Sequence, residues 1–145
     1  MSIADQAAAC FDDGFNCSQS VFSAFAPQLG LDRVAALKVA GAFGGGMGRM
    51  GETCGAVTGA LMVIGLKYGQ TTGEDKAAKE KSYELVKQFA ERFKARNRGC
   101  LTCRELLGAD ISTPEGMQKL REKRAFTTLC PKFVRDAAEI VEELL

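Results

Sequence analysis

With 145 residues, the chain is long enough for one domain that buries its own hydrophobic core without disulfide staples. Its 19 basic and 18 acidic residues give a net charge of +1, which argues against nucleic acid and anionic membranes as partners. The six cysteines and the absence of histidine exclude Ser-His-Asp triads, Cys-His dyads and histidine-ligated metals, so sulfur chemistry is the first expectation.

The N-terminal part of the chain predicts three short helices separated by turn residues. The first covers residues 3–11 and ends before an Asp-Asp-Gly turn. Asn16 is expected to cap the second helix, which ends at Pro27. Asp32 is expected to cap the third, which ends near Gly41. In the second and third helices the apolar residues recur at helical spacing, so each has one face to bury.

A cluster of five glycines between Gly44 and Gly51 is not expected to form a regular element. It matches neither a Walker A motif nor a dinucleotide fingerprint, and nucleotide binding is therefore not favoured. The cluster leads into an apolar helix from about Thr53 to Tyr68, which is expected to be buried. The first turns of this helix carry small residues that would let a second backbone approach closely: Gly55, Ala56, Gly59 and Ala60.

The longest amphipathic stretch covers residues 74–98 and places Leu85, Phe89 and Phe93 on one face. Its opposite face carries lysine, glutamate and arginine, as is typical of a solvated surface. After a short turn, residues 103–107 are expected to form one or two further helical turns.

Two more helix starts follow in the C-terminal part of the chain. Thr113 precedes a proline, the typical order of an N-cap and the first helical residue. Pro131 opens the last helix. No run of five residues alternates convincingly as a strand does. The sequence therefore predicts an all-α fold: a single-domain helical bundle over residues 1–145, in which a glycine-rich loop leads into a buried apolar helix.

Cys54 is the first candidate nucleophile, because it lies in the first turn of the apolar helix, directly after the glycine-rich segment. Unpaired N–H groups and the positive end of the helix dipole favour a thiolate there, so a lowered thiol pKa is expected. Arg49 would add to this effect and Glu52 would oppose it. In the structural alternative, Cys54 is a small buried hydrophobic residue in a close helix contact.

The other cysteines fall into two groups. Cys100 and Cys103 form a C-x-x-C pair, whose spacing permits a local disulfide or two ligands on one metal ion. Neither the βαβ context of a thioredoxin nor the second C-x-x-C of a zinc ribbon is found. Cys10 lies among alanines and is expected to belong to the core. Four cysteines stand at predicted helix starts, which can converge at one end of a bundle: Cys17, Cys54, Cys103 and Cys130.

Four short motifs in this order resemble one known family. They are Asn16-Cys17, Gly51-Glu52-x-Cys54-Gly55-Ala56-x-x-Gly59, Cys103-Arg104-Glu105-Leu106-Leu107-Gly108 and Cys130-Pro131. From about Ala8 to the C-terminus, the chain resembles the C_GCAxxG_C_C family of small redox-active proteins. The family name writes glycine before cysteine, whereas here Cys54 precedes Gly55. The resemblance implies that the four shared cysteines are the functional set and that Cys10 and Cys100 lie outside it.

Three functions are compatible with these residues. The leading hypothesis is a thiol redox protein acting by thiol–disulfide exchange, of which a thiol–disulfide oxidoreductase is one form. Cys54 would attack, and one of the other three helix-start cysteines would resolve the mixed disulfide. In the first alternative the four thiolates hold Zn²⁺ or an iron–sulfur cluster. In the second, the protein is a non-catalytic helical interaction module with its cysteines in the core.

The expected partners follow from the leading hypothesis. They are a redox partner protein, a small thiol or a second copy of the chain, and no particular cofactor is indicated. The apolar run from Ala56 to Leu66 is far shorter than the roughly 20 residues that span a bilayer, so membrane insertion is not expected. The N-terminal sequence has no secretory pattern, which favours the cytoplasm, where thiols are kept reduced.

Overall fold

The computed structural model describes residues 1–145 and confirms the predicted all-α fold. It contains no strand, and the only β-type pairing is an isolated bridge between Thr53 and Thr102. None of the helices combines the length and the apolar character needed to cross a bilayer. The α-helices are α1 (Ile3–Asp12), α2 (Cys17–Phe25), α3 (Arg33–Ala40), α4 (Gly44–Met47), α5 (Gly55–Tyr68), α6 (Lys76–Arg96), α7 (Cys103–Leu107), α8 (Pro114–Glu122), α9 (Ala125–Thr128) and α10 (Cys130–Leu144), and the 3₁₀ helices are η1 (Pro27–Leu29) and η2 (Gly41–Phe43).

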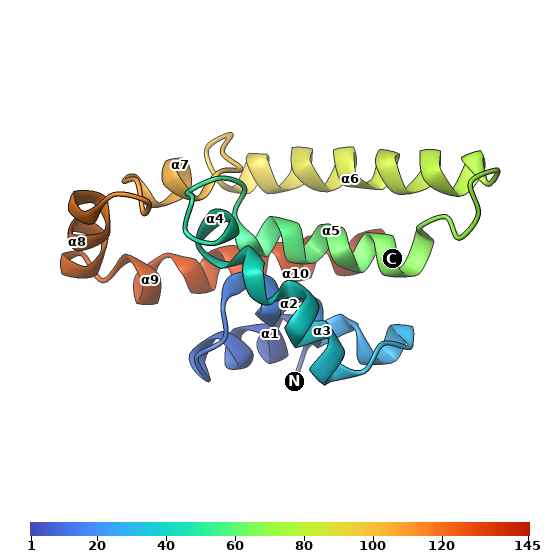
Figure 1. Ribbon diagram of the computed structural model, residues 1–145, viewed down its shortest axis with the longest axis horizontal. Helices are drawn as coiled ribbons and strands as arrows, with labels where there is room; N and C mark the ends of the chain where they lie inside the picture. Colours follow the sequence, from blue (N-terminus) through green and yellow to red (C-terminus); the bar gives the residue numbers. More distant parts are fainter.

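Three long helices form the body of the molecule. Helices α5, α6 and α10 run side by side along its length, and α1, α2 and α3 lie below them in Figure 1. Helix α2 packs against both α5 and α10, and α1 packs against α2 and α10. The short helices α7, α8 and α9 lie together at the end of the molecule near α4 (Figure 1). The starts of α5 and α10 therefore lie toward the same end of the bundle.

The core forms where the predicted apolar faces meet. Phe89 and Phe93 of α6 are fully buried, and their rings stack with centroids 5.9 Å apart. Ile64 of α5 is buried, whereas Leu61 and Leu66 on the same helix are half-buried. The apolar α5 is thus packed against its neighbours as predicted, and its buried residues belong to one cluster with those of α2, α6 and α10.

Several helix boundaries follow from capping residues that the sequence identified. The Asn16 side chain accepts a hydrogen bond from the Gln19 N–H, and the Gln19 side chain bonds the Asn16 N–H in return. Asp32 and Thr113 likewise cap α3 and α8. The stretch predicted over residues 74–98 is helical from Lys76 to Arg96, because Asp75 caps it.

The end of α6 is held against α10 by a polar network centred on the buried side chains of Asn97 and Asp136. Asp136 of α10 accepts hydrogen bonds from Arg96, Asn97 and Lys132, at distances of 3.3, 3.2 and 2.6 Å. Lys132 also donates to the Asn97 side chain at 2.9 Å. Because these partners satisfy the buried carboxylate, the network fixes the first turns of α10, where Cys130 lies.

The glycine-rich segment is not a regular right-handed helix, as predicted, although it coils tightly enough to be drawn as α4. Five consecutive residues from Gly45 to Arg49 have positive φ angles, so the chain makes a left-handed turn. Glycine adopts this conformation without strain, but Met47 (φ 66°) and Arg49 (φ 68°) do not. The fold therefore holds two side chains in a costly backbone conformation at this point.

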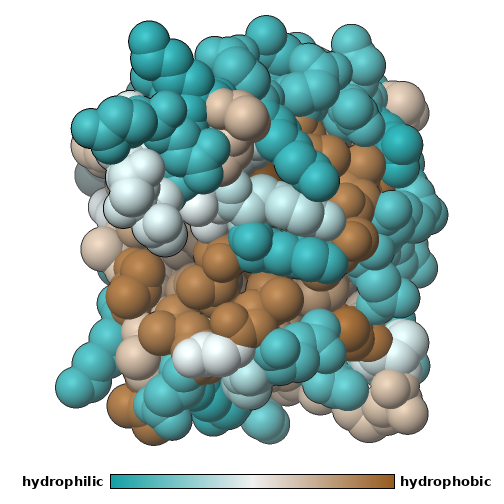
Figure 2. All heavy atoms as spheres, turned by 90° about the vertical axis from the view of Figure 1, so that its right-hand side faces the viewer, coloured by the Kyte–Doolittle hydropathy of each residue, from teal (hydrophilic) through white to brown (hydrophobic).

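The surface includes apolar areas as well as charged ones. Figure 2 shows hydrophobic residues gathered on one face of the molecule and bordered by hydrophilic residues. The large hydrophobic side chains that are exposed include Val34 and Val39 of α3. Apolar patches of this kind are typical of interaction surfaces. A homo-oligomer stays a prediction.

Candidate functional site

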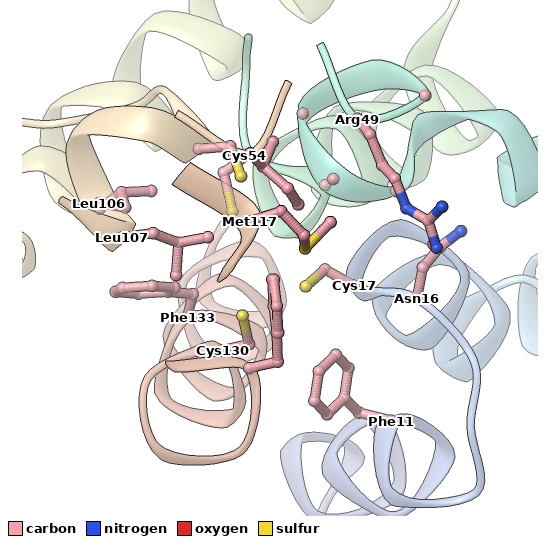
Figure 3. Close-up of a pocket in the computed structure, with 18 of the residues that line it drawn as sticks. Phe11, Asn16, Cys17, Arg49, Cys54, Leu106, Leu107, Met117, Cys130 and Phe133 are labelled. Carbon is pink, nitrogen blue, oxygen red and sulfur yellow. The ribbon is translucent and has the colours of Figure 1, made fainter. Parts of the chain in front are cut away.

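The helix-start cysteines converge, as the sequence predicted. A cavity of about 560 Å³ is lined by Cys17 at the start of α2, Cys54 before α5, Cys103 at the start of α7 and Cys130 at the start of α10. Figure 3 shows the labelled thiols directed into one space from different elements. Cys17 is half-buried, and the other three are 5–7% exposed. Sulfur atoms from four distant parts of the chain therefore face a single chamber.

Close packing of α2 against α5 places Cys17 beside Cys54. A Cβ on Gly55 would lie 3.1 Å from the Cys17 Cβ and 3.0 Å from the Ser18 backbone nitrogen. A Cβ on Gly59, one turn later, would lie 2.7 Å from the Ser18 carbonyl oxygen. The small residues noted in the sequence thus allow the two helices to approach to backbone contact, and the first turns of both helices reach the cavity together.

Cys54 and Cys103 are held near each other by the isolated bridge. The Cys54 N–H donates to the Leu101 carbonyl at 2.9 Å, and the Cys103 N–H donates to the Glu52 carbonyl at 2.6 Å. Because side chains alternate along a strand, the bridging residues Thr53 and Thr102 place the two cysteines diagonally on one face. No local pattern in the sequence indicates this pairing of distant segments.

Asn16 connects the glycine-rich segment to the cysteine-bearing start of α2. Its side chain donates to the Gly41 carbonyl at 3.1 Å while it caps α2. A Cβ on Gly44 would lie 2.6 Å from the Asn16 side chain, so the segment lies directly on this residue. The Asn16-Cys17 motif therefore positions the cavity wall as well as the thiol.

The lowered pKa expected for Cys54 is wrong. Burial raises the pKa of this thiol to about 12, although hydrogen bonds from the Ala56 and Val57 N–H groups act in the opposite direction. The helix N-terminus thus favours the thiolate, as predicted, but desolvation outweighs it. Burial likewise raises the pKa of Cys103 to about 12. Neither thiol is ionised at neutral pH.

Cys17 and Cys130 interact, and this interaction shifts their pKa values in opposite directions. Interaction with the Cys17 thiol lowers the pKa of Cys130, and the same interaction is the largest cause of the raised pKa of Cys17. Cys17 thus keeps its proton and stabilises a thiolate on Cys130. Cys130 also lies in the first turn of the 15-residue α10, where the helix dipole favours negative charge. Cys130 is the cavity thiol that ionises most readily.

The two remaining cysteines do not line the cavity. Cys10 is buried in α1 as predicted, with its sulfur 3.7 Å from the Ser23 hydroxyl. Cys100 is half-buried and donates to the Arg98 carbonyl at 3.6 Å. All six cysteines are free thiols, so the C-x-x-C of Cys100 and Cys103 is not a disulfide in this structure. No three cysteine, aspartate or glutamate side chains are arranged so that they could hold a metal ion.

The rest of the cavity wall consists of apolar residues and glycines, apart from Asn16 and two arginines. Phe11, Leu107 and Phe133 contribute apolar surface, and Arg49 and Arg121 contribute positive charge. Arg49 was noted in the sequence for its charge near Cys54. Arg121 was not, because α8 reaches the cavity only through the folding of distant segments. Glu52, expected to oppose a thiolate, instead pairs with Arg104.

Comparison with known proteins agrees with this arrangement of cysteines. A family model described as "Putative redox-active protein (C_GCAxxG_C_C)" matches residues 15–144. No curated protein and no solved structure matches the chain. The matched range includes all four cavity cysteines and excludes Cys10.

Proposed function

Because the chain belongs to the C_GCAxxG_C_C family, we propose that it is a redox protein that exchanges thiols and disulfides in the cysteine-lined cavity. One observation carries this proposal: cysteines from four separate helix starts line the same cavity. Cys10 is buried to a similar degree but does not line the cavity, so burial of cysteines does not by itself bring them to this site. The observation also favours exchange over a non-catalytic interaction module.

In the proposed reaction, Cys130 is the attacking thiolate and Cys17 the resolving thiol. The Cys130 thiolate attacks one sulfur of a substrate disulfide, forms a mixed disulfide and releases the other sulfur as a thiolate that takes up a proton. The Cys17 sulfur, deprotonated as the second thiol leaves, then attacks Cys130 and closes a protein disulfide. Two protein thiols lose two electrons and two protons, and one disulfide becomes two thiols.

Cys54 and Cys103 provide a second dithiol in the same cavity. They keep their protons at neutral pH, so they react after Cys130 rather than before it. By a second exchange they reduce the Cys17–Cys130 disulfide and become a disulfide themselves, with no net change in the number of electrons. A reducing compartment such as the cytoplasm suits this role, because it restores the thiols. A redox partner protein or a small thiol would supply the electrons.

Mapping of disulfides after mild oxidation tests the proposal. The protein is treated with diamide, its free thiols are alkylated, and the remaining disulfides are identified by mass spectrometry. We expect a reversible disulfide between Cys17 and Cys130 that forms first. The matched control is Cys100→Ser, which removes a half-buried thiol outside the cavity and should leave the rate unchanged. Cys17→Ser should prevent closure. Six free thiols after oxidation would contradict the proposal.

The order of reactivity is tested by the pH dependence of alkylation. The rate of iodoacetamide labelling is followed at each cysteine as the pH is raised. At Cys130 the rate should reach half its maximum at a pH below 9.0, the ordinary thiol pKa. Labelling of Cys54 should still be rising above that pH, since its pKa is about 12. Cys17→Ala should raise the midpoint at Cys130, because it removes the thiol that stabilises the charge. If Cys54 is labelled at lower pH than Cys130, the assignment of the attacking thiol is wrong.

A further inference from the structure

The cavity combines thiols with positive charge and lacks acidic residues. Arg49 and Arg121 are exposed cations on its lining, and neither takes part in any ion pair of the protein. No aspartate or glutamate belongs to the lining. The nearby carboxylate of Glu52 is already paired with Arg104. The lining of the cavity therefore carries positive charge, which attracts anions.

Arg49 is held at the cavity at a cost in backbone energy. It is one of two residues other than glycine in the left-handed turn, with φ 68°. A Cβ on Gly45 would lie 2.9 Å from the Arg49 Cγ, so the turn leaves space for this side chain to fold across it. Figure 3 shows Arg49 extending from the glycine-rich segment toward Asn16. Strained residues of this kind are concentrated at functional sites.

The dimensions and the walls of the cavity define the rest of the ligand. A volume of about 560 Å³ lies within the usual range of small-molecule sites. Cys130 is only 6% exposed, so a folded protein surface would have difficulty reaching it, whereas a small molecule can enter. Phe11, Leu107 and Phe133 offer apolar surface to an alkyl or aromatic group. Size, apolar walls and charge thus select a small, partly apolar anion.

We propose that the substrate class is small organic disulfides and thiols that carry carboxylate groups, bound by Arg49 and Arg121 while their sulfur reaches Cys130. This inference rests on the proposed thiol–disulfide exchange and adds the specificity of the site. In a single turnover, two cavity thiols become a protein disulfide and one substrate disulfide becomes two carboxylate-bearing thiols. The substrate is itself the oxidant, so electrons and protons balance without another reagent.

The test compares two aromatic disulfides of different charge in single turnovers at low ionic strength. The anionic probe is 5,5′-dithiobis(2-nitrobenzoate), and the neutral probe is 2,2′-dithiodipyridine. The full chain is used with Cys10→Ala and Cys100→Ser, so that only the cavity thiols react. We expect each of Arg49→Gln and Arg121→Gln to slow the anionic probe by about fivefold, and the double variant by more than tenfold. The neutral probe should change by less than twofold.

Lys119→Gln is the matched control, because Lys119 is an exposed cation on the same helix as Arg121 and does not line the cavity. It should leave both rates unchanged. If Lys119→Gln slows the anionic probe as much as Arg121→Gln does, or if the arginine variants slow both probes equally, the inference is overturned while the exchange activity stands. If neither probe oxidises the cavity thiols of the protein that keeps both arginines, the proposed function itself fails.

Discussion

Replacing Gly59 by alanine tests whether the backbone contact between α2 and α5 builds the cavity. The new Cβ would lie 2.7 Å from the Ser18 carbonyl oxygen and 3.1 Å from the Val21 Cβ, so a backbone segment must move. Overpacking of this kind costs about 1–3 kcal/mol. Alanine gains about 1 kcal/mol over glycine in a helix, which offsets part of that cost. We therefore expect Gly59→Ala to be destabilising by about 1 kcal/mol in net terms.

Gly65→Ala in the same helix separates the effect of the α2–α5 contact from the effect of alanine's higher helix propensity. Gly65 is exposed, and a Cβ there would meet nothing within 4 Å. This variant should therefore gain about 0.5–1 kcal/mol. The difference between the two variants then reports the contact alone, about 2 kcal/mol, or about 4–8 °C in Tm for a chain of this size.

Urea unfolding gives the free energy of each variant, and diamide oxidation gives the rate at which Cys17 and Cys130 close. Because Ser18 follows Cys17 directly, displacement of α2 should slow closure in Gly59→Ala and leave Gly65→Ala unaffected. Equal shifts in stability for the two alanines would refute the packing argument. A destabilised Gly59→Ala with an unchanged rate of closure would refute the link between this contact and the position of the thiols.

Two further predictions concern the strained turn and the acid limit of stability. Arg49→Gly should raise the free energy of unfolding by about 0.5–1 kcal/mol, because glycine adopts the left-handed backbone without strain and the side chain that is removed is exposed. Thermal unfolding measures the change, and a loss of stability would contradict the argument. Hydrogen bonds with Arg135 and Ser2 lower the pKa of Asp5 from 3.8 to about 2. The stability that the Asp5–Arg135 pair contributes is therefore present above about pH 4 and is lost as the pH falls toward 2. Tm measured against pH should therefore fall less steeply over this range in Asp5→Asn than in the unsubstituted chain, and parallel curves would show that the pair contributes nothing.

Local rules account for most of the fold. The caps at Asn16, Asp32 and Thr113 start helices because their side chains bond nearby N–H groups, an interaction contained within four residues of sequence. The spacing of Phe89 and Phe93 is also a local signal, because residues four positions apart lie on the same face of a helix, and here that face is buried. Four cysteines stood at predicted helix starts, and because helix starts can converge at one end of a bundle, the sequence alone suggested that these thiols could meet.

What the sequence could not supply was the environment of each thiol. The position of Cys54 before a helix correctly indicated N–H groups that favour its thiolate, but its pKa is raised by burial, which depends on long-range packing that no local pattern encodes. The same limit hid the bridge between Thr53 and Thr102 and the approach of Arg121, since both depend on long-range folding. The attacking thiol that we propose is therefore Cys130, whereas the sequence pointed to Cys54.

Three glycines and the cavity cysteines around them work together structurally. Each of three glycines faces an element that carries another cavity cysteine: Gly46 would place a Cβ 2.7 Å from the Cys103 Cβ, Gly55 would place one 3.1 Å from the Cys17 Cβ, and Gly59 meets Ser18. A side chain at any of these positions would push the sulfur-bearing segments apart. A reactive pair requires its sulfur atoms to meet at about 2 Å when a disulfide closes. The missing side chains are thus as necessary to the proposed chemistry as the thiols, because they set how closely the starts of α2, α5 and α7 can gather.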